Sequence, residues 1–238
     1  METAISPLPP PSSFGTLNEN SLHAALKQWY SLPGDQLETW VENYIIDIVR
    51  DDLLIEIQTG QFSALKPKTE KLANNYKIQI IHPIIKNKWI IKSDNKGATT
   101  GKRKSPKKGR IEDLFNQLIR VPHIFSHPNI SLTVPLVEAE ELWKDDGKGS
   151  WRRKHWSIAD KKLVKIIEEY SFFSPAELLD LLPANLPTDF TNKDLASALK
   201  LTTTQAQKMT YSLRKIDLLS LTGKNGNSHL HAVNKPGI

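Results

Sequence analysis

Apolar positions along the chain recur with the periods of helices and strands, and they predict an alternating order of the two. A helix is expected at 17–30, where apolar residues return at helical spacing behind Asn18 as the N-cap. The runs that follow predict three strands, a helix and two strands, at 37–41, 44–49, 53–58, 63–74, 76–81 and 89–92. Residues 17–92 are therefore expected to form a small α/β unit.

The pattern changes after residue 92. Residues 93–110 are rich in Gly, Ser, Thr and Lys without any periodicity, which indicates a loop or linker. Residues 111–156 form a connecting region that is helical near its start and has no clear pattern afterwards. A helix is expected at 157–170, where Ser157 and Asp160 have the spacing of a capping box.

The end of the chain has a distinctive order of elements. A short helix at 191–199 and a longer one at 204–216 are separated by a polar turn. Two β-rich runs then flank the turn signal Asn225-Gly226. Helix, turn, helix and hairpin resemble a winged helix-turn-helix domain, so we expect a mostly α-helical domain of that kind over residues 157–238.

Composition narrows the class of protein. The 238 residues include no cysteine, which excludes disulfide frameworks, cysteine-based zinc sites, iron–sulfur clusters and thiol nucleophiles. No apolar run approaches the roughly 20 residues of a membrane helix. The Pro/Ser-rich start, residues 1–16, lacks the apolar core of a secretory signal. We therefore expect a disordered N-terminal tail on a cytoplasmic protein that does not contact a membrane.

The net charge of +6 is modest but unevenly distributed. Residues 86–110 hold ten basic residues and one acid, so this segment carries +9 and the other 213 residues sum to −3. Such a segment favours a polyanionic partner, because each Lys or Arg placed on a phosphate releases condensed counterions. A solvated linker whose charge serves solubility would account for the same pattern.

The sharpest chemical signal lies between residues 44 and 60, where two apolar runs flank a polar turn. If Asp51 and Asp52 are a two-residue turn, paired positions sum to 103 and Asp47 faces Glu56. Gln58 shares their face because strand side chains alternate with period two. Facing carboxylates repel each other, and a hard cation such as Mg²⁺ (or Mn²⁺) relieves that repulsion.

A third acid accompanies the hairpin. Glu19 precedes Leu22, Leu26 and Trp29 by three, seven and ten residues, so it lies on the apolar stripe of the first helix and points toward the sheet. Simpler explanations exist for each acid. Glu19 interacts favourably with the helix dipole, and a hairpin carboxylate could cap a turn or pair with Arg50, Lys66 or Lys68.

A helix acid, a strand Asp and Glu-x-Gln on the next strand, followed by a helix and a strand, resemble the PD-(D/E)XK (restriction-endonuclease-like) nuclease superfamily. The matching residues are Glu19, Asp47 and Glu56-Ile57-Gln58. The resemblance implies a mixed sheet flanked by helices and metal-dependent hydrolysis of DNA phosphodiester bonds. It makes Asp47 and Glu56 the metal ligands and Glu19 a supporting or second-metal acid. Gln58, which stands where the superfamily usually has Lys, would orient the attacking water.

The stretches LHAALKQWY and GSWRRKHWS also make the chain look like a bacterial family of unknown function in which such a core precedes a winged helix. Duplex or branched DNA is the expected partner. The basic residues expected to bind it are Lys102, Arg103, Lys104, Lys107, Lys108, Arg152, Arg153, Lys208, Arg214 and Lys224. A homodimer and a protein partner of the winged helix stay open. The competing function is a non-catalytic DNA-binding or regulatory protein with a degenerate nuclease core, because Gln58 lacks the charge of Lys.

Overall fold

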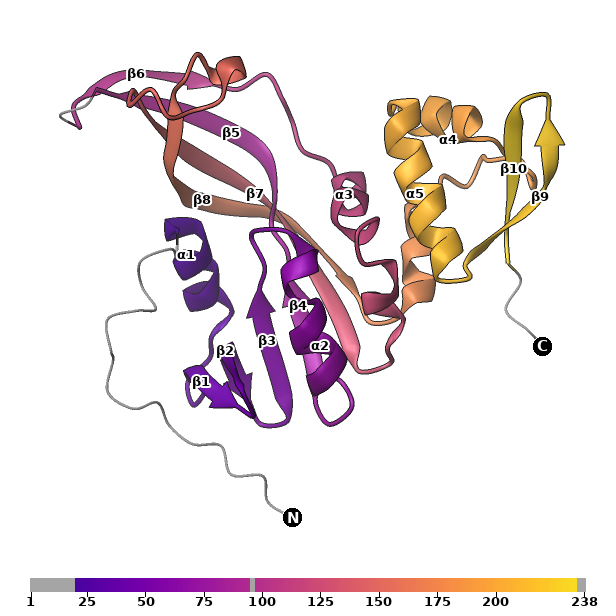
Figure 1. Cartoon of the computed structure of the whole chain (residues 1–238), viewed down its shortest axis with the longest axis horizontal. Coiled ribbons are helices and arrows are strands. Elements are labelled where there is room, and N and C mark those ends of the chain that lie inside the picture. The colour runs from indigo at the N-terminus through magenta and orange to yellow at the C-terminus, as the bar shows by residue number, and fades with distance from the viewer. Residues whose placement is uncertain (1–19, 95–96, 235–238) are drawn as a thin grey trace. The chain divides into compact units, whose positions relative to one another are not determined.

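The computed structural model describes residues 20–94 and 97–234 of the chain (Figure 1). The expected N-terminal tail and Glu19 lie outside the described residues. Two compact units are built from interleaved segments, and each is described by itself below. The described part of the first comprises 20–59, 80–94, 97–110 and 134–170, and that of the second comprises 60–79, 111–133 and 171–234. The protein is mixed α/β with a large mixed sheet and flanking helices, as the sequence predicts at this level.

Eight strands form one sheet in the order β1-β2-β3-β4-β7-β5-β6, and β8 pairs with β7. These strands are β1 (Gln36–Val41), β2 (Tyr44–Arg50), β3 (Leu53–Ile57), β4 (Lys77–Ile81), β5 (Ile84–Ser93), β6 (Thr99–Lys104), β7 (Ile130–Lys144) and β8 (Ser157–Phe172). The pairs β1–β2, β2–β3 and β5–β6 are antiparallel, whereas β5 and β7 are parallel. Strands β4, β7 and β8 contribute residues to both units.

The core of the first unit forms where α1 (Ser21–Tyr30) packs on β2 and β3. Leu22 and Leu26 of the helix are buried in one cluster with Ile48, Ile55 and Ile57. Their spacing of four puts both leucines on one helix face. The N-cap of the helix is Asn20, whose side chain accepts a hydrogen bond from the His23 N–H (3.0 Å). The expected cap, Asn18, lies outside the described residues.

The predicted helix at 157–170 is wrong, because these residues form strand β8. β-Branched Val164, Ile166 and Ile167 favour a strand, and Ile166 packs on the buried cluster under α1. Asp160 does cap a helix, but not its own segment. Its carboxylate accepts hydrogen bonds from the backbone N–H of Ser21 (3.0 Å) and from the Ser21 hydroxyl (2.5 Å) at the start of α1.

The expected linker at 93–110 also contains a strand. Residues 99–104 form β6, which pairs with β5 so that Trp89 faces Lys104 and Ile91 faces Lys102. Lysines are compatible with this place because β6 ends the sheet, and charged side chains on an edge strand stay in water. The basic residues of β6 are thus fixed in register on a sheet, which a flexible linker would not achieve.

The second unit is mostly helical. It comprises η1 (Phe62–Ala64), α2 (Lys66–Leu72), η2 (Ile111–Leu114), α3 (Phe115–Leu118), η3 (Pro122–Ser126), η5 (Pro175–Leu181), α4 (Asn192–Leu199), α5 (Thr203–Lys215) and the hairpin of β9 (Leu219–Asn225) with β10 (Ser228–Val233). Reciprocal capping boxes begin α4, with Thr191 and Asp194, and α5, with Thr202 and Gln205. The order of helix, helix and hairpin agrees with the sequence pattern. Among the described residues, no helix is long and apolar enough to cross a membrane.

The hairpin of the second unit differs from the pattern in two details. Asn225 pairs with Ser228, so the turn residues are Gly226 and Asn227, one position later than expected. The pairing register shifts where Thr222 of β9 is skipped, between the pairs Leu230–Gly223 and His231–Leu221. His231 is buried at 2% exposure, whereas His229, two residues nearer the turn, is exposed.

We expect Asp160→Ala to lower the free energy of unfolding by about 1 kcal/mol, which is typical for the loss of a helix N-cap. Burial opposes ionisation, but hydrogen bonds from Ser21 hold the pKa of the Asp160 carboxyl below its usual 3.8. The contribution is therefore complete at neutral pH and is lost as the pH falls through the folded-state pKa. Urea unfolding at pH 7 measures the loss. Asp180→Ala, which removes an exposed acid, is the matched control, and an equal loss there would contradict the assignment.

Two buried histidines make stability fall in weak acid. Burial lowers the pKa of both His82 and His231, so below about pH 6.5 the unfolded chain binds more protons than the folded one. Each histidine then removes at most about 1.4 kcal/mol per pH unit. His231→Phe should flatten the decline between pH 6.5 and 5 in urea titrations, and His229→Phe on the same strand should not. Identical pH profiles for the two variants would refute the prediction.

Candidate metal site and nucleic-acid surfaces

The β2–β3 hairpin has the register that a two-residue turn predicts. Ile48 pairs with Ile55, so paired positions sum to 103, and Asp51 adopts a left-handed conformation with φ of 49°. The pairing runs as far as Ile48 and Ile55, and Asp47 and Glu56 are the next residues along the two strands. The Glu56 side chain belongs to the buried set, with 5% of the residue exposed, and Asp47 is half-buried. Two of the predicted site residues are thus brought to neighbouring strands.

Both carboxylate oxygens of Asp47 are engaged. Oδ1 lies 3.1 Å from Nε2 of His23 on α1, and Oδ2 accepts a hydrogen bond from the Ile57 N–H (2.8 Å). One turn further along α1, Lys27 pairs with Glu38 of β1 at 2.5 Å. Sequence reasoning missed His23. The sequence did contain a signal for it: His23 and Lys27 are four residues apart and so share one face of the helix. That helix covers strands that carry acidic residues.

Gln58 follows the last residue of β3, and its backbone is fully used. Its N–H donates to the Ile81 carbonyl (2.8 Å), and its carbonyl lies 2.6 Å from Nδ1 of His82. Burial lowers the pKa of His82, so the imidazole is neutral at pH 7 and donates from Nδ1. The carbonyl of Gln58 is therefore occupied by His82.

Arg50, one of the alternative partners of the hairpin carboxylates, pairs elsewhere. Its Nε and one terminal nitrogen donate to the two oxygens of Asp35 at 2.9 and 2.8 Å, and the same terminal nitrogen reaches the Tyr30 carbonyl at 2.8 Å. The hydrogen bond from this guanidinium holds the pKa of the Asp35 carboxyl below its usual value. Lys66 lies 3.8 Å from Glu70 within α2. The pairing expected for Arg50 under that alternative is not formed.

The donor set fits Mg²⁺ in number and type. Mg²⁺ is usually held by one or two carboxylates and keeps several waters or phosphate oxygens, and Asp47 with Glu56 supplies two carboxylates from one hairpin. Within residues 20–94 and 97–234, no three His, Asp or Glu side chains gather as a metal cluster. An ion at this hairpin would therefore take its remaining ligands from water or substrate and would compete with His23 for Asp47.

The basic segment lies on the β5–β6 hairpin, where acids of β7 temper its charge. Lys88 pairs with Glu141 (3.0 Å) and Lys102 with Glu140 (2.8 Å). The ammonium groups of Lys102 and Lys104 lie 5.3 and 5.6 Å from the ring centroid of Trp89, within the range of a cation–π contact. The predicted residues that stay exposed are Lys102, Arg103, Lys104, Lys107 and Lys108.

Arg152 and Arg153 lie in the single turn η4 (Trp151–Arg153), between β7 and β8. The Arg152 guanidinium lies 5.5 Å from the ring centroid of Trp151, and Arg153 Nε donates to the Trp156 carbonyl (3.1 Å). Lys92 of β5 lies 4.4 Å from the ring centroid of Trp156. The structure thus brings this loop to the β5–β6 hairpin, which the sequence separates by more than forty residues.

The three basic residues predicted in the C-terminal module differ in their surroundings. Lys208 is half-buried and donates to Oδ1 of Asn116 (2.7 Å). Arg214 is also half-buried, and its Nε is a buried atom without a hydrogen-bond partner. Lys224, on the β9–β10 hairpin, is exposed. Only Lys224 of the three has the free surface position that a phosphate contact needs.

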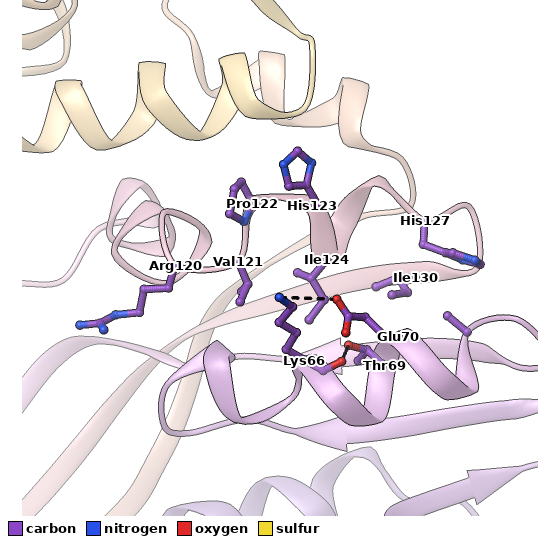
Figure 2. A pocket seen from close by; sticks show the side chains of 11 residues that line it. Lys66, Thr69, Glu70, Arg120, Val121, Pro122, His123, Ile124, His127 and Ile130 are labelled. Atoms are coloured by element: carbon purple, nitrogen blue, oxygen red, sulfur yellow. Dashed lines mark hydrogen bonds and ion pairs between the residues drawn. The ribbon is translucent and has the colours of Figure 1, made fainter.

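A cavity of about 330 Å³ lies in the second unit between α2 and the segment 120–130 (Figure 2). Its apolar wall includes Val121, Ile124 and Ile130, and Lys66 and Glu70 face each other at its edge. The volume is near the lower end for small-molecule sites. None of the site residues predicted from the sequence lines this cavity. Its wall is formed by apolar residues, and from the sequence alone such residues are expected only in the hydrophobic core.

One family model and one relative match the chain. A family model described as "Domain of unknown function (DUF8091)" matches residues 20–173. A protein of Treponema pallidum (strain Nichols), described as an uncharacterized protein, is 27% identical over 226 residues, which cover 94% of this chain and 89% of the relative. No solved structure matches the chain.

The family match runs from Asn20, the N-cap of α1, to Phe173, the residue after β8, and so includes every strand of the large sheet. It also includes Asp47, Glu56 and the loop with Arg152 and Arg153. It spans more than half of the chain. The protein therefore belongs to the DUF8091 family.

Proposed function

We propose that the protein is a Mg²⁺- or Mn²⁺-dependent nuclease that hydrolyses DNA phosphodiester bonds. The observation that carries the proposal is the register of the β2–β3 hairpin, in which Asp47 and Glu56 follow the paired Ile48 and Ile55 and each acid stands between two Ile residues. Facing carboxylates destabilise a strand pair unless a cation or proton compensates them. His23 gives Asp47 one such partner, and a divalent ion would serve both acids.

The order of elements supports the same proposal. Helix α1 is followed by the strands β1, β2 and β3, then by α2 and β4, and the four strands are neighbours in the sheet in that order. This is the order that the resemblance to the PD-(D/E)XK superfamily implies. Asp47 and Glu56 lie on the two strands that the resemblance assigns to the metal ligands.

Each residue then has a defined task. Asp47 and Glu56 would hold the ion, which when bound supplies activation of water and neutralisation of charge on the phosphate. Gln58 would orient the water with its side-chain amide, since its carbonyl is held by His82. Glu19, which precedes the cap of α1 in the sequence, keeps its proposed role as a supporting acid. His23 would hold Asp47 in the metal-free protein.

We propose that DNA is bound mainly on the first unit. Arg103, Lys104, Lys107 and Lys108 are exposed along and after β6. Lys102 would contribute less, because Glu140 pairs with it at 2.8 Å. In the second unit, the helix–helix–hairpin module would bind DNA as a winged helix through Lys224, and Lys208 and Arg214 would support its packing. The alternative is that this module contacts a protein partner or a second copy of the chain.

A non-catalytic DNA-binding function is the second candidate, and two observations favour it. Both oxygens of Asp47 already have partners in the metal-free protein. Gln58 carries no charge that could stabilise a hydroxide. Such a protein would bind DNA through the same basic residues but would neither cut it nor respond to divalent ions.

We expect the purified protein to nick plasmid DNA with Mn²⁺ and to lose at least about a hundredfold in rate when Glu56→Ala or Asp47→Asn removes a metal ligand. Asp51→Asn is the matched control. It removes an exposed acid from the turn of the same hairpin, and Asn tolerates the left-handed conformation there. Agarose-gel assays of plasmid, linear, branched and single-stranded substrates measure the rates.

Metal binding separates the two candidate functions independently of cleavage. A divalent ion at a hundredfold excess over Kd stabilises the folded state by about 2.7 kcal/mol. Thermal unfolding should therefore shift upward with Mn²⁺ in the wild type and in Asp51→Asn, and should not shift in Asp47→Asn. If the wild type neither melts later nor cuts any substrate, the nuclease proposal fails and the binding protein remains.

Neutralising Arg103, Lys104, Lys107 and Lys108 to Gln should weaken duplex binding equally for all sequences. The slope of log K against log salt should become shallower by about 0.9 for each phosphate that the protein no longer neutralises. Fluorescence anisotropy over a salt series measures both quantities. Neutralising Lys161, Lys162 and Lys165 of β8 is a control that removes similar charge elsewhere. If the variant that lacks Arg103, Lys104, Lys107 and Lys108 binds DNA with unchanged affinity and salt slope, β6 does not bind DNA.

A further inference from the structure

The loop 149–156, between β7 and β8, is closed on itself by main-chain hydrogen bonds. The Gly149 N–H donates to the His155 carbonyl (2.8 Å), and the Ser150 carbonyl accepts from the N–H groups of Arg153 (2.9 Å) and His155 (3.1 Å). A side chain at 149 would not fit, because its Cβ would lie 1.8 Å from the Trp156 carbonyl oxygen. The sequence therefore encodes one compact loop shape, with Gly149 at the point where its two ends meet.

Two adjacent residues of this loop adopt the left-handed conformation. Lys154 has φ of 52° and His155 has φ of 65°, which is unfavourable for residues that carry a Cβ. Backbone strain of this kind persists only where the surrounding structure holds it, and it is concentrated at binding sites. The hydrogen bonds of the loop supply that support here.

The loop presents an aromatic ring to solvent. Trp151 is 74% exposed, the highest value for any large apolar side chain in residues 20–94 and 97–234. It contributes nothing to the core, yet its neighbour Arg152 lies with its guanidinium 5.5 Å from the ring centroid. A Trp this exposed adds little to folding, and its ring is open to a ligand with a flat, polarisable face.

The charge around Trp151 is entirely positive in the local sequence. No acid occurs from 147 to 159, whereas Arg152, Arg153 and Lys154 follow the Trp directly. Lys92 of β5 lies over Trp156 at the end of the loop (4.4 Å), and the Asp145 N–H meets the Ser93 carbonyl at 3.4 Å. The loop thus lies beside the β5–β6 hairpin (Figure 1), which carries the basic residues of β6.

We propose that the loop 149–156 binds single-stranded nucleic acid, with an unpaired base stacked on Trp151 and phosphates contacted by Arg152 and Lys154. Proteins that bind single strands combine a basic track with aromatic rings on which successive bases stack. Bases within a duplex are stacked on one another and do not offer their faces. The inference rests on the proposed nucleic-acid function of the basic surface, but not on metal binding or cleavage.

An anionic membrane offers related chemistry, since Trp and basic residues also gather at membrane interfaces. Stable adsorption needs a broad apolar face, and Trp151 is the one exposed large apolar side chain between 145 and 160. The loop also continues into a basic edge strand, β6, that is suited to a linear row of phosphates. These observations favour a nucleic-acid strand over a lipid surface.

The test measures binding of the full-length protein in EDTA to fluorescent oligo(dT) of about 20 nucleotides, which exceeds the site size of a single module. Trp151→Ala should weaken binding by roughly 5- to 150-fold, the range for loss of one stacked base, and Trp151→Phe should restore most of it. Trp29→Ala removes another exposed Trp, on α1, and should change nothing. A duplex of equal length should show less than a threefold loss with Trp151→Ala.

Four outcomes overturn the proposal. They are no binding of wild-type protein to oligo(dT), equal affinities of wild type and Trp151→Ala, an equal loss on duplex, and a loss confined to vesicles of phosphatidylcholine and phosphatidylserine. Equal melting temperatures of wild type and Trp151→Ala establish that any loss is not unfolding. EDTA removes divalent ions, so the binding measured here requires neither metal nor cleavage. The binding result can therefore be interpreted even if the nuclease proposal fails.

Discussion

The two-residue turn between β2 and β3 decides the register of this hairpin, and the first unit depends on that register. Asp51 takes up the left-handed conformation, which Asp and Asn tolerate better than most residues. A slip of one residue would turn Ile48 and Ile55 away from α1, because every side chain of a strand would change face. The same register makes Asp47 and Glu56 the next residues along the two strands. Core packing and candidate chemistry thus share one cause.

Helix α1 is held at both ends by residues that are distant in sequence. Asp160 of β8 accepts hydrogen bonds from Ser21 at the first turn, and Arg50 of β2 donates to the Tyr30 carbonyl at the last. Charge-assisted hydrogen bonds of this kind are stronger and more directional than neutral ones. They fix the helix so that His23 reaches Asp47, and the candidate metal hairpin inherits its surroundings from this placement.

The basic segment carries less available positive charge than its composition suggests, and its residues are more ordered than those of a linker. Glu140 and Glu141 of β7 neutralise Lys102 and Lys88, because β5 lies between β6 and β7 in the sheet. The Lys102–Glu140 pair is partly exposed and contributes little to stability, but both pairs lower the charge available to a polyanion. What remains is a row of cations fixed on an edge strand and continued by a rigid loop with an exposed Trp.

The sequence by itself determined the features that rest on local interactions. The register of β2 and β3, in which paired residue numbers sum to 103, follows from a turn and its flanking apolar runs. The capping box of α4 is formed by Thr191 and Asp194, which are three residues apart. The order of helix, helix and hairpin near the C-terminus follows from short periodic segments. Tertiary structure decided the rest. Asp160 caps a helix 139 residues away, and the segment around it becomes a strand because β7 offers a hydrogen-bonding edge and the α1 core accepts Ile166. His23 at Asp47 and Lys208 at Asn116 likewise depend on contacts between distant segments, which no local period encodes because their partners meet only after the chain has folded.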